Sequence, residues 1–155
     1  MKKTGKKIVA SNHRARRDYF IEEEYEAGMV LTGNEVKSIR NGKINLQDGL
    51  ARIENQEIYL YNVHIAPYAF ASNQDYEPKR TRKLLLHKRE INRLYGITQR
   101  KGYTLVPLSI YFKKGRAKLN LGVGKGKKQF DKRDTIKKRE LSRSLQRTFK
   151  GKSNV

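Results

Sequence analysis

The sequence predicts a mainly β protein: an OB-like antiparallel β-barrel with about two or three short helices and a basic C-terminal tail. Three observations predict this fold. Short runs with apolar residues at alternate positions recur along residues 18–124, turn-forming residues separate these runs, and two helical patterns interrupt them. The length of 155 residues suits one domain with extensions. OB-like barrels of this size bind oligonucleotides.

The first strands begin at Tyr19. The stretch YFIEEEYEAGMVLTG predicts a strand, a turn and a second strand, with the turn or a bulge near Gly28. The stretch NEVKSIRNGK that follows predicts one short helix, with Asn34 as its N-cap and Gly42 as its C-cap.

A β-hairpin is expected next. Its strands are QDGLARIE and EIYLYNVHI, joined near Asn55-Gln56. Ile58 and Leu60 fall on one face of the second strand, and the other face takes Tyr59, Tyr61 and Val63. Both faces are partly apolar, which favours a small closed barrel with helical cover.

The segment from Pro67 to Pro78 reads as a loop. After it, TRKLLLHKREINRLYG predicts a helix that Gly96 ends. Its buried stripe is expected from Leu84 or Leu85, Ile91, and Leu94 or Tyr95.

The final hairpin has the clearest pattern. GYTLVPLSIYF and RAKLNLGVG flank a turn at Lys114-Gly115. Pro107 indicates an edge strand or a bulge, because proline cannot donate to the sheet. One face of the second strand is expected to be buried through Ala117, Leu119, Leu121 and Val123.

Charge divides the chain into three parts. The net charge is +21, with 36 Lys and Arg against 15 Asp and Glu. Residues 1–17 hold seven basic residues and no acid, residues 18–124 hold seventeen against twelve, and residues 125–155 hold twelve against three. We therefore expect a basic N-terminal arm, an OB-like RNA-binding barrel and a basic tail with these bounds. Nucleic acid is the favoured partner, with an anionic membrane or a merely soluble, highly charged protein as alternatives.

Several classes of protein are excluded. The chain has no cysteine, so it forms neither a disulfide framework nor a thiolate metal site. No apolar run approaches the ~18 residues of a membrane span, and the basic N-terminus lacks the apolar stretch of a signal peptide. The stretch GVGKGKK is not a P-loop, which needs G-x-x-x-x-G-K followed by Ser or Thr. Only three residues separate Gly122 from Gly126, and Lys128 stands where the Ser or Thr hydroxyl is required. These glycines are expected to give a flexible exit that lets lysines approach phosphates.

No catalytic, metal or cofactor site stands out. His13, His64 and His87 lack metal-ligand spacing. Glu22, Glu24 and Glu26 would share one face of a strand, which keeps open a metal-dependent RNA-processing enzyme that uses the Glu22–Glu26 cluster. A solvated strand face that balances nearby cations is the simpler interpretation.

Three clusters combine cationic donors with groups that stack, as RNA-binding surfaces do. SNHRARRDYF offers Asn12, His13, Arg14, Arg16 and Arg17 with Tyr19 as a stacking platform, EVKSIRNGK offers Lys37, Arg40 and Lys43, and KRTRK spans Lys79–Lys83. In the tail, an apolar stripe is formed by Leu141, Leu145 and Phe149. Such a segment can fold along a polyanion or lie on a membrane surface.

Four stretches carry a family resemblance. They are NHRARRDYFIEEEYEAGMVLTGNEVKSIRNGKINLQD, RTRKLLLHKREINRLYG, GYTLVPLSIYFKKGRAKLNLGVGKGKKQFDKR and the basic tail, which cover most of residues 12–150 in family order. The chain resembles the bacterial transfer-messenger-RNA-binding proteins, also called small protein B or SsrA-binding proteins.

This resemblance implies a function. An OB-like barrel would bind the tRNA-like domain of transfer-messenger RNA (tmRNA) and deliver it to stalled ribosomes for trans-translation. The tail would occupy the decoding region, built of small-subunit ribosomal RNA, and the empty mRNA channel, where it would become helical. The resemblance also implies a functional link to elongation factor Tu and alanyl-tRNA synthetase, a cytoplasmic location and no membrane partner.

The resemblance also implies site residues. RNA binding would fall to Asn12, Glu26, Lys37, Ser38, Arg80, Thr81, Arg82 and Lys83, and at the barrel exit to Lys125, Lys127 and Lys128. The ribosomal decoding region would be met by Gly126, Phe130, Asp131, Lys132, Arg133, Lys137, Lys138 and Arg139. Many family members carry His where this chain has Phe130, which favours stacking over proton transfer there.

Overall fold

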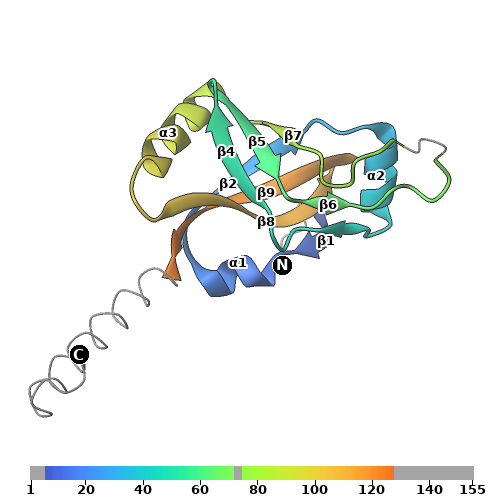
Figure 1. The fold of residues 1–155 in the computed structure, drawn as a ribbon, viewed down its shortest axis with the longest axis horizontal. Helices are drawn as coiled ribbons and strands as arrows, with labels where there is room; N and C mark the ends of the chain where they lie inside the picture. Colours follow the sequence, from blue (N-terminus) through green and yellow to red (C-terminus); the bar gives the residue numbers. More distant parts are fainter. Residues whose placement is uncertain (1–5, 72–74, 128–155) are drawn as a thin grey trace, which may run out of the picture.

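The computed structural model describes residues 6–71 and 75–127. Their elements are β1 (Lys6–Ser11), α1 (His13–Asp18), β2 (Tyr19–Met29), α2 (Gly33–Arg40), β3 (Ile44–Asn45), β4 (Leu50–Glu54), β5 (Glu57–Tyr61), β6 (His64–Ile65), β7 (Arg82–Leu85), α3 (Lys88–Thr98), β8 (Tyr103–Lys113) and β9 (Arg116–Gly126) (Figure 1). This confirms a mainly β fold with three short helices in the described part of the chain.

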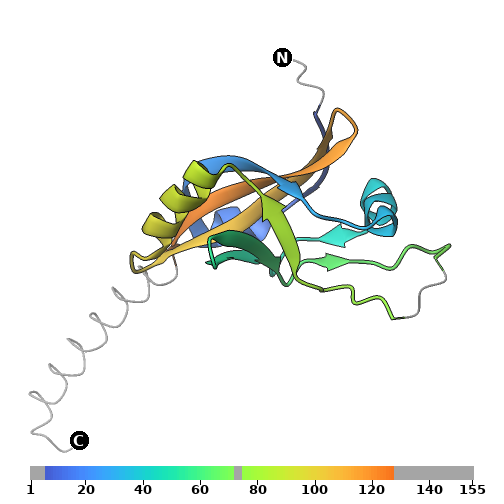
Figure 2. The same cartoon turned by 90° about the horizontal axis from the view of Figure 1, so that it is seen from above.

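The strands form a closed antiparallel ring. The sheet runs β1-β8-β4-β5-β7-β2-β9, and a further pairing of β8 with β9 closes it. One edge of β8 pairs with two strands along its length. Leu105 pairs with β4, and Ser109 to Lys113 pair with β1. Helix α3 lies at one end of the barrel and α2 at the other, as Figures 1 and 2 show from two sides.

Residues 6–17, which the charge pattern assigned to a basic arm, belong to the folded unit. β1 pairs with β8, and α1 packs against β2 and β8. Within residues 6–71 and 75–127, no helix is long and apolar enough to cross a bilayer.

β2 is one continuous strand, and the expected turn at Gly28 was wrong. Gly28 pairs with Leu85 of β7 and Lys118 of β9. A Cβ at Gly28 would lie 3.3 Å from the Leu85 Cβ, so the glycine serves a close approach between strands. The bulge of β2 lies earlier, between Ile21 and Glu23.

The β4–β5 hairpin turns at Asn55-Gln56 as expected, with φ of 53° and 65°. Ile58 and Leu60 are fully buried. The expectation that Val63 faces away from them was wrong, because Val63 joins the same core. Asn62, between β5 and β6, has φ of 63°, and this residue interrupts the alternation of the strand.

Helix α2 begins one residue before Asn34, so Asn34 is not its N-cap. Thr32 caps it, because the Thr32 hydroxyl accepts a hydrogen bond from the Glu35 N–H at 3.2 Å. The Glu35 carboxylate accepts one from the Thr32 N–H at 2.9 Å, which completes a capping box. Asn41 is the C-cap, and Gly42 follows with φ of +72°, the left-handed conformation that glycine accepts.

The helix expected from Thr81 to Gly96 divides into a strand and a shorter helix. Residues Arg82–Leu85 form β7 between β5 and β2, and α3 starts at Lys88 and continues past Gly96. Leu84 is buried as a strand residue, whereas Leu85 and Tyr95 are exposed. Tertiary pairing with two strand edges outweighs the local helical pattern here.

The β8–β9 hairpin is confirmed. It turns at Lys114-Gly115 with φ of 52° and 78°, and a bulge follows Pro107. Leu119, Leu121 and Val123 enter the main core. Gly122 and Gly124 are strand residues rather than a flexible exit: a Cβ would lie 2.8 Å from Leu108 Cδ1 or 3.0 Å from Tyr19 Cβ, respectively. Their small size makes room for the apolar layer beneath α1, formed by Ala15, Val106 and Leu108.

Candidate nucleic-acid interface

Asn12 holds α1 against the barrel. Its side-chain oxygen caps the helix by accepting from the Ala15 N–H at 3.1 Å. Its amide nitrogen donates to the Leu46 and Pro107 carbonyls at 3.0 and 2.9 Å. The residue is 4% exposed. Asn12 therefore acts as a positioning residue, and direct contact with RNA stays a prediction.

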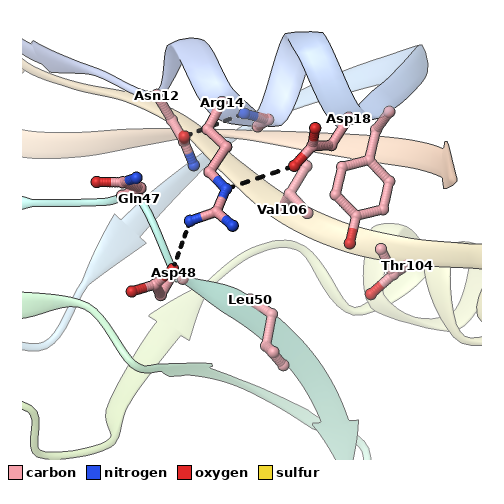
Figure 3. A pocket seen from close by; sticks show the side chains of 11 residues that line it. Asn12, Arg14, Asp18, Gln47, Asp48, Leu50, Thr104 and Val106 are labelled. Atoms are coloured by element: carbon pink, nitrogen blue, oxygen red, sulfur yellow. Dashed lines mark hydrogen bonds and ion pairs between the residues drawn. The ribbon is translucent and has the colours of Figure 1, made fainter. Parts of the chain in front are cut away.

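Arg14 bridges two carboxylates beside Asn12 (Figure 3). It lies 3.5 Å from Asp18 and 3.2 Å from Asp48, across a cavity of about 230 Å³ between α1 and residues 47–50. Two negative partners offset this one positive charge. His13, Arg16 and Arg17 are exposed on the same short helix, where Arg16 lies 3.5 Å from Glu24 and Arg17 lies 3.7 Å from Asp18.

A second group of predicted residues meets where β9 ends. The Lys127 ammonium lies 4.9 Å from the centre of the Phe20 ring and donates to the Arg16 carbonyl at 3.3 Å. Lys125 lies 5.8 Å from the ring of Tyr103. The cation–π contacts link the barrel exit to β2 and β8, and the hydrogen bond links it to α1.

The exposed aromatic side chain at this exit is Phe20. Phe20 is 52% exposed, whereas Tyr19, our expected stacking platform, packs against the apolar layer under α1. The two residues are neighbours in β2 and point to opposite faces. If the face of β2 that α1 covers had been known, Phe20 would have been identified as the exposed aromatic residue.

Glu26 lies among cations on the outer face of the barrel. The Tyr111 hydroxyl donates to it at 2.6 Å, and the Lys113 ammonium lies 3.4 Å away. The hydrogen bond from Tyr111, together with Lys113 and the nearby charge of Lys118, lowers the pKa of Glu26 against a smaller opposing effect of burial. The carboxylate therefore stays ionised and has neighbouring lysines that offset its charge.

A groove of about 340 Å³ opens at the end of β2, beside the β8–β9 turn. Arg116, Lys118 and exposed Leu85 contribute to its walls. It joins cationic side chains to an apolar floor, a combination suited to nucleic acid. Sequence reasoning did not name these residues as contacts, because β7 and the hairpin end meet only in the folded barrel.

The KRTRK stretch divides between the interior and the surface. Arg82 is fully buried and donates to Glu35 at 2.9 and 2.7 Å. Arg80 donates to the same carboxylate at 2.6 Å. Lys83 pairs with Glu57 at 2.8 Å. Thr81 and Lys79 are exposed.

Helix α2 presents exposed Lys37 and Arg40, and exposed Lys43 follows it. Ser38 is 1% exposed, and its hydroxyl has no hydrogen-bond partner within the described residues. The structure thus places Lys37 and Lys43 where RNA can reach them and Ser38 in the interior. Any role of Ser38 in RNA binding stays a prediction.

The acidic run of β2 is paired residue by residue. Glu22 accepts from the Tyr103 hydroxyl, Glu23 pairs with Arg93, and Glu24 accepts from the Asn120 amide. Glu22, Glu24 and Glu26 are the exposed positions of the alternation in β2, as expected of one strand face, and a bulge lies between Ile21 and Glu23. Over the described ranges, no three His, Asp or Glu side chains are grouped as a metal site requires.

The remaining predicted site residues lie outside the described part of the chain. They are Lys128, Phe130, Asp131, Lys132, Arg133, Lys137, Lys138 and Arg139. Gly126 is described: it ends β9 and its N–H donates to the Gly102 carbonyl at 3.1 Å.

Comparison with known proteins decides the family. Residues 9–151 match the family model described as SmpB protein. The chain belongs to the SmpB protein family. An SsrA-binding protein of Geobacillus thermodenitrificans is 54% identical over 149 residues, 96% of each chain. One from Halalkalibacterium halodurans is 54% identical over 153 residues, 99% of each chain.

A solved structure is similar to this chain as well. It is described as "tmRNA-SmpB: a journey to the center of the bacterial ribosome". The TM-score is 0.65 at 53% identity, over 76% of this chain and 83% of that chain. Family and fold thus agree with the resemblance found in the sequence.

Proposed function

We propose that the chain is a non-enzymatic RNA-binding adaptor that binds the tRNA-like domain of tmRNA and delivers it to stalled ribosomes for trans-translation. The observation that carries this proposal is membership of the SmpB family along residues 9–151, where relatives are SsrA-binding proteins. A similar chain was solved as tmRNA–SmpB of the bacterial ribosome.

The barrel surface supports this role. Lys118 lines the groove together with Leu85 and Arg116. Its charge also acts on Glu26, which contacts Lys113. In this proposal, the lysines and Arg116 contact phosphates, and Glu26 accepts a hydrogen bond from a base or sugar donor. Asn12, Ser38 and Arg82 would act by holding α1, α2 and β7 in place, because their side chains are buried.

The end of β9 would direct the tail toward the ribosome. Lys127 is held between Phe20 and the Arg16 carbonyl, which sets the direction in which the chain leaves the barrel. The tail would then enter the decoding region and the empty mRNA channel. Elongation factor Tu and alanyl-tRNA synthetase would act on the same RNA, and the protein would work in the cytoplasm.

The test is a binding series at several salt concentrations with the full chain. The RNAs are the tRNA-like domain of tmRNA and a size-matched duplex. We expect the structured domain to bind more tightly at every salt concentration, and the Lys118→Gln variant to lower the salt slope by about 1. Equal binding to both RNAs would contradict the proposal. Metal-dependent cleavage of the RNA, lost in Glu22→Ala, would favour the enzyme alternative.

A further inference from the structure

The loop after β6 carries a pair of aromatic side chains, half-buried Tyr68 and exposed Phe70. Tyr68 and Phe70 meet edge to face, with ring centres 5.5 Å apart and planes at 67°. Phe70 is 85% exposed, more than any other large apolar side chain in the described ranges. The loop extends away from the barrel on the side of α2 (Figures 1 and 2).

A cationic side chain of α2 lies beside this pair. The Lys37 ammonium lies 5.3 Å from the centre of the Tyr68 ring. The backbone of Lys43, whose side chain is also exposed, accepts a hydrogen bond from the Ala66 N–H at 3.0 Å, where the loop begins. One positive charge therefore lies over the Tyr68 ring, and a second exposed lysine is tied through its backbone to the start of the loop.

The base of the loop is anchored. The Tyr76 hydroxyl lies 2.9 Å from the Ile65 carbonyl and accepts from Arg82 at 2.9 Å. Arg82 also donates to the Pro78 carbonyl at 3.0 Å. Buried Arg82, which is paired with Glu35, thus joins Ile65 at one end of the loop to Pro78 at the other through these hydrogen bonds.

A cavity of about 100 Å³ lies between the base of this loop and the start of α2. Tyr68 and Tyr76 form apolar walls, and Asn34 is exposed at its edge. A carboxamide offers both a donor and an acceptor, which suits the edge of a nucleobase.

We propose that Tyr68 and Phe70 form a stacking platform for an unpaired base of the bound RNA, with Lys37 contacting the adjacent phosphate. Exposed aromatic rings beside cations are the arrangement that binds unstacked bases. The centres of protein interfaces are instead depleted of lysine. This proposal rests on the proposed function and adds a contact on a loop that the sequence marked only as a connection.

The chain contains no tryptophan, so a Phe70→Trp variant has a single reporter. We expect addition of the tRNA-like domain to quench its emission in a saturable, stoichiometric manner, because a stacked base quenches indole. The matched control is Tyr95→Trp, at an α3 position that is 51% exposed, whose emission should not change. Quenching of both reporters to the same degree, or of neither, would overturn the proposal.

Affinity measurements complete the test. Phe70→Ala and Phe70→Leu should each weaken RNA binding on the order of tenfold, because neither can stack, while Phe70→Tyr should retain wild-type affinity. Phe70 packs little, so these variants should unfold like the wild type. If the Phe70 variants bind RNA normally and only Phe70→Ala reduces tagging on stalled ribosomes, the surface binds a protein and the proposal is wrong. If the wild-type chain does not bind this RNA, the proposed function itself fails.

Discussion

Arg82 and Glu35 meet in the interior of the barrel with their side chains 0% and 1% exposed. The guanidinium of Arg82 donates twice to one carboxylate oxygen, at 2.9 and 2.7 Å, and once to the Val63 carbonyl at 2.7 Å. The ion pair ties β7 to α2, and the bond to Val63 ties β7 to the segment between β5 and β6. It assigns a structural role to an arginine that the family pattern associates with RNA.

Removing Arg82 should destabilise the fold. Arg82→Ala leaves Glu35 buried with only part of its compensation, so we expect a loss of about 3–5 kcal/mol in the free energy of unfolding. Arg80→Ala is the control, because Arg80 is partly exposed and its loss should cost less. Urea denaturation of both variants measures the difference. A loss of RNA affinity in Arg82→Ala without a loss of stability would contradict this assignment.

Stability should also depend on pH through Glu35. Burial alone would raise the pKa of Glu35, but hydrogen bonds from Arg80, the Thr32 N–H and Arg82 outweigh it and lower the pKa to about 2 from an ordinary value of 4.5. The folded-state pKa is depressed, so this contribution is present above about pH 4.5 and is lost as the pH falls toward 2.

The measurement is the free energy of unfolding as a function of pH, for the wild type and Glu35→Gln. The wild type should lose on the order of 3 kcal/mol more than the variant across this range. Parallel curves for the two proteins would show that Glu35 does not supply the dependence.

Asn12 should be required for the position of α1. Asn12→Ala removes the cap of the helix and leaves the Leu46 and Pro107 carbonyls without their donor, so we expect a loss of about 2–3 kcal/mol. Asn12→Asp keeps the capping oxygen but sets a carboxylate oxygen against the two carbonyls in a buried site, so its loss should be at least as large. Ser11→Ala, at the exposed neighbouring position, should change stability little. Thermal unfolding compares the three variants, and equal effects in Asn12→Ala and Ser11→Ala would disprove the cap.

Gly122 and Gly96 should respond in opposite directions to alanine. A Cβ at Gly122 would lie 2.8 Å from Leu108, so Gly122→Ala should cost about 1–3 kcal/mol by overpacking. Gly96 lies inside α3 with no atom within 4 Å of a new Cβ, so Gly96→Ala should stabilise by about 0.5–1 kcal/mol. The measurement is the melting temperature of each variant: a Gly122→Ala variant as stable as the wild type would mean that Gly122 of β9 does not pack against Leu108 as described.

The lysines near Glu26, Lys113 and Lys118, should account for part of the salt dependence of RNA binding. Lys118→Gln removes one cation beside the groove and should weaken binding to every RNA tested, with a salt slope smaller by about 1. Arg52→Gln is the control, since exposed Arg52 lies on β4 and stacks on Tyr61. Equal slopes for wild type and Lys118→Gln would place the phosphates elsewhere.

Much of the fold follows from local sequence. The alternating residues of β9, the turn at Lys114-Gly115 and the turn at Asn55-Gln56 are set by neighbours in the chain, because side-chain alternation and left-handed turn residues are local properties. The basic composition and the family stretches predicted an RNA-binding barrel for the same reason: both can be read along the chain.

Only the tertiary structure decided which of the predicted residues reach the surface. KLLLHKRE carries a helical pattern, yet Arg82–Leu85 form a strand because β5 and β2 offer two edges. Tyr19 and Phe20 are adjacent, and α1 covers one of them and leaves the other exposed. Arg82 looks like an RNA contact until Glu35, 47 positions away, is found beside it. Burial and pairing depend on residues distant in sequence, so charge and pattern predicted the partner, while folding determined which side chains can touch it.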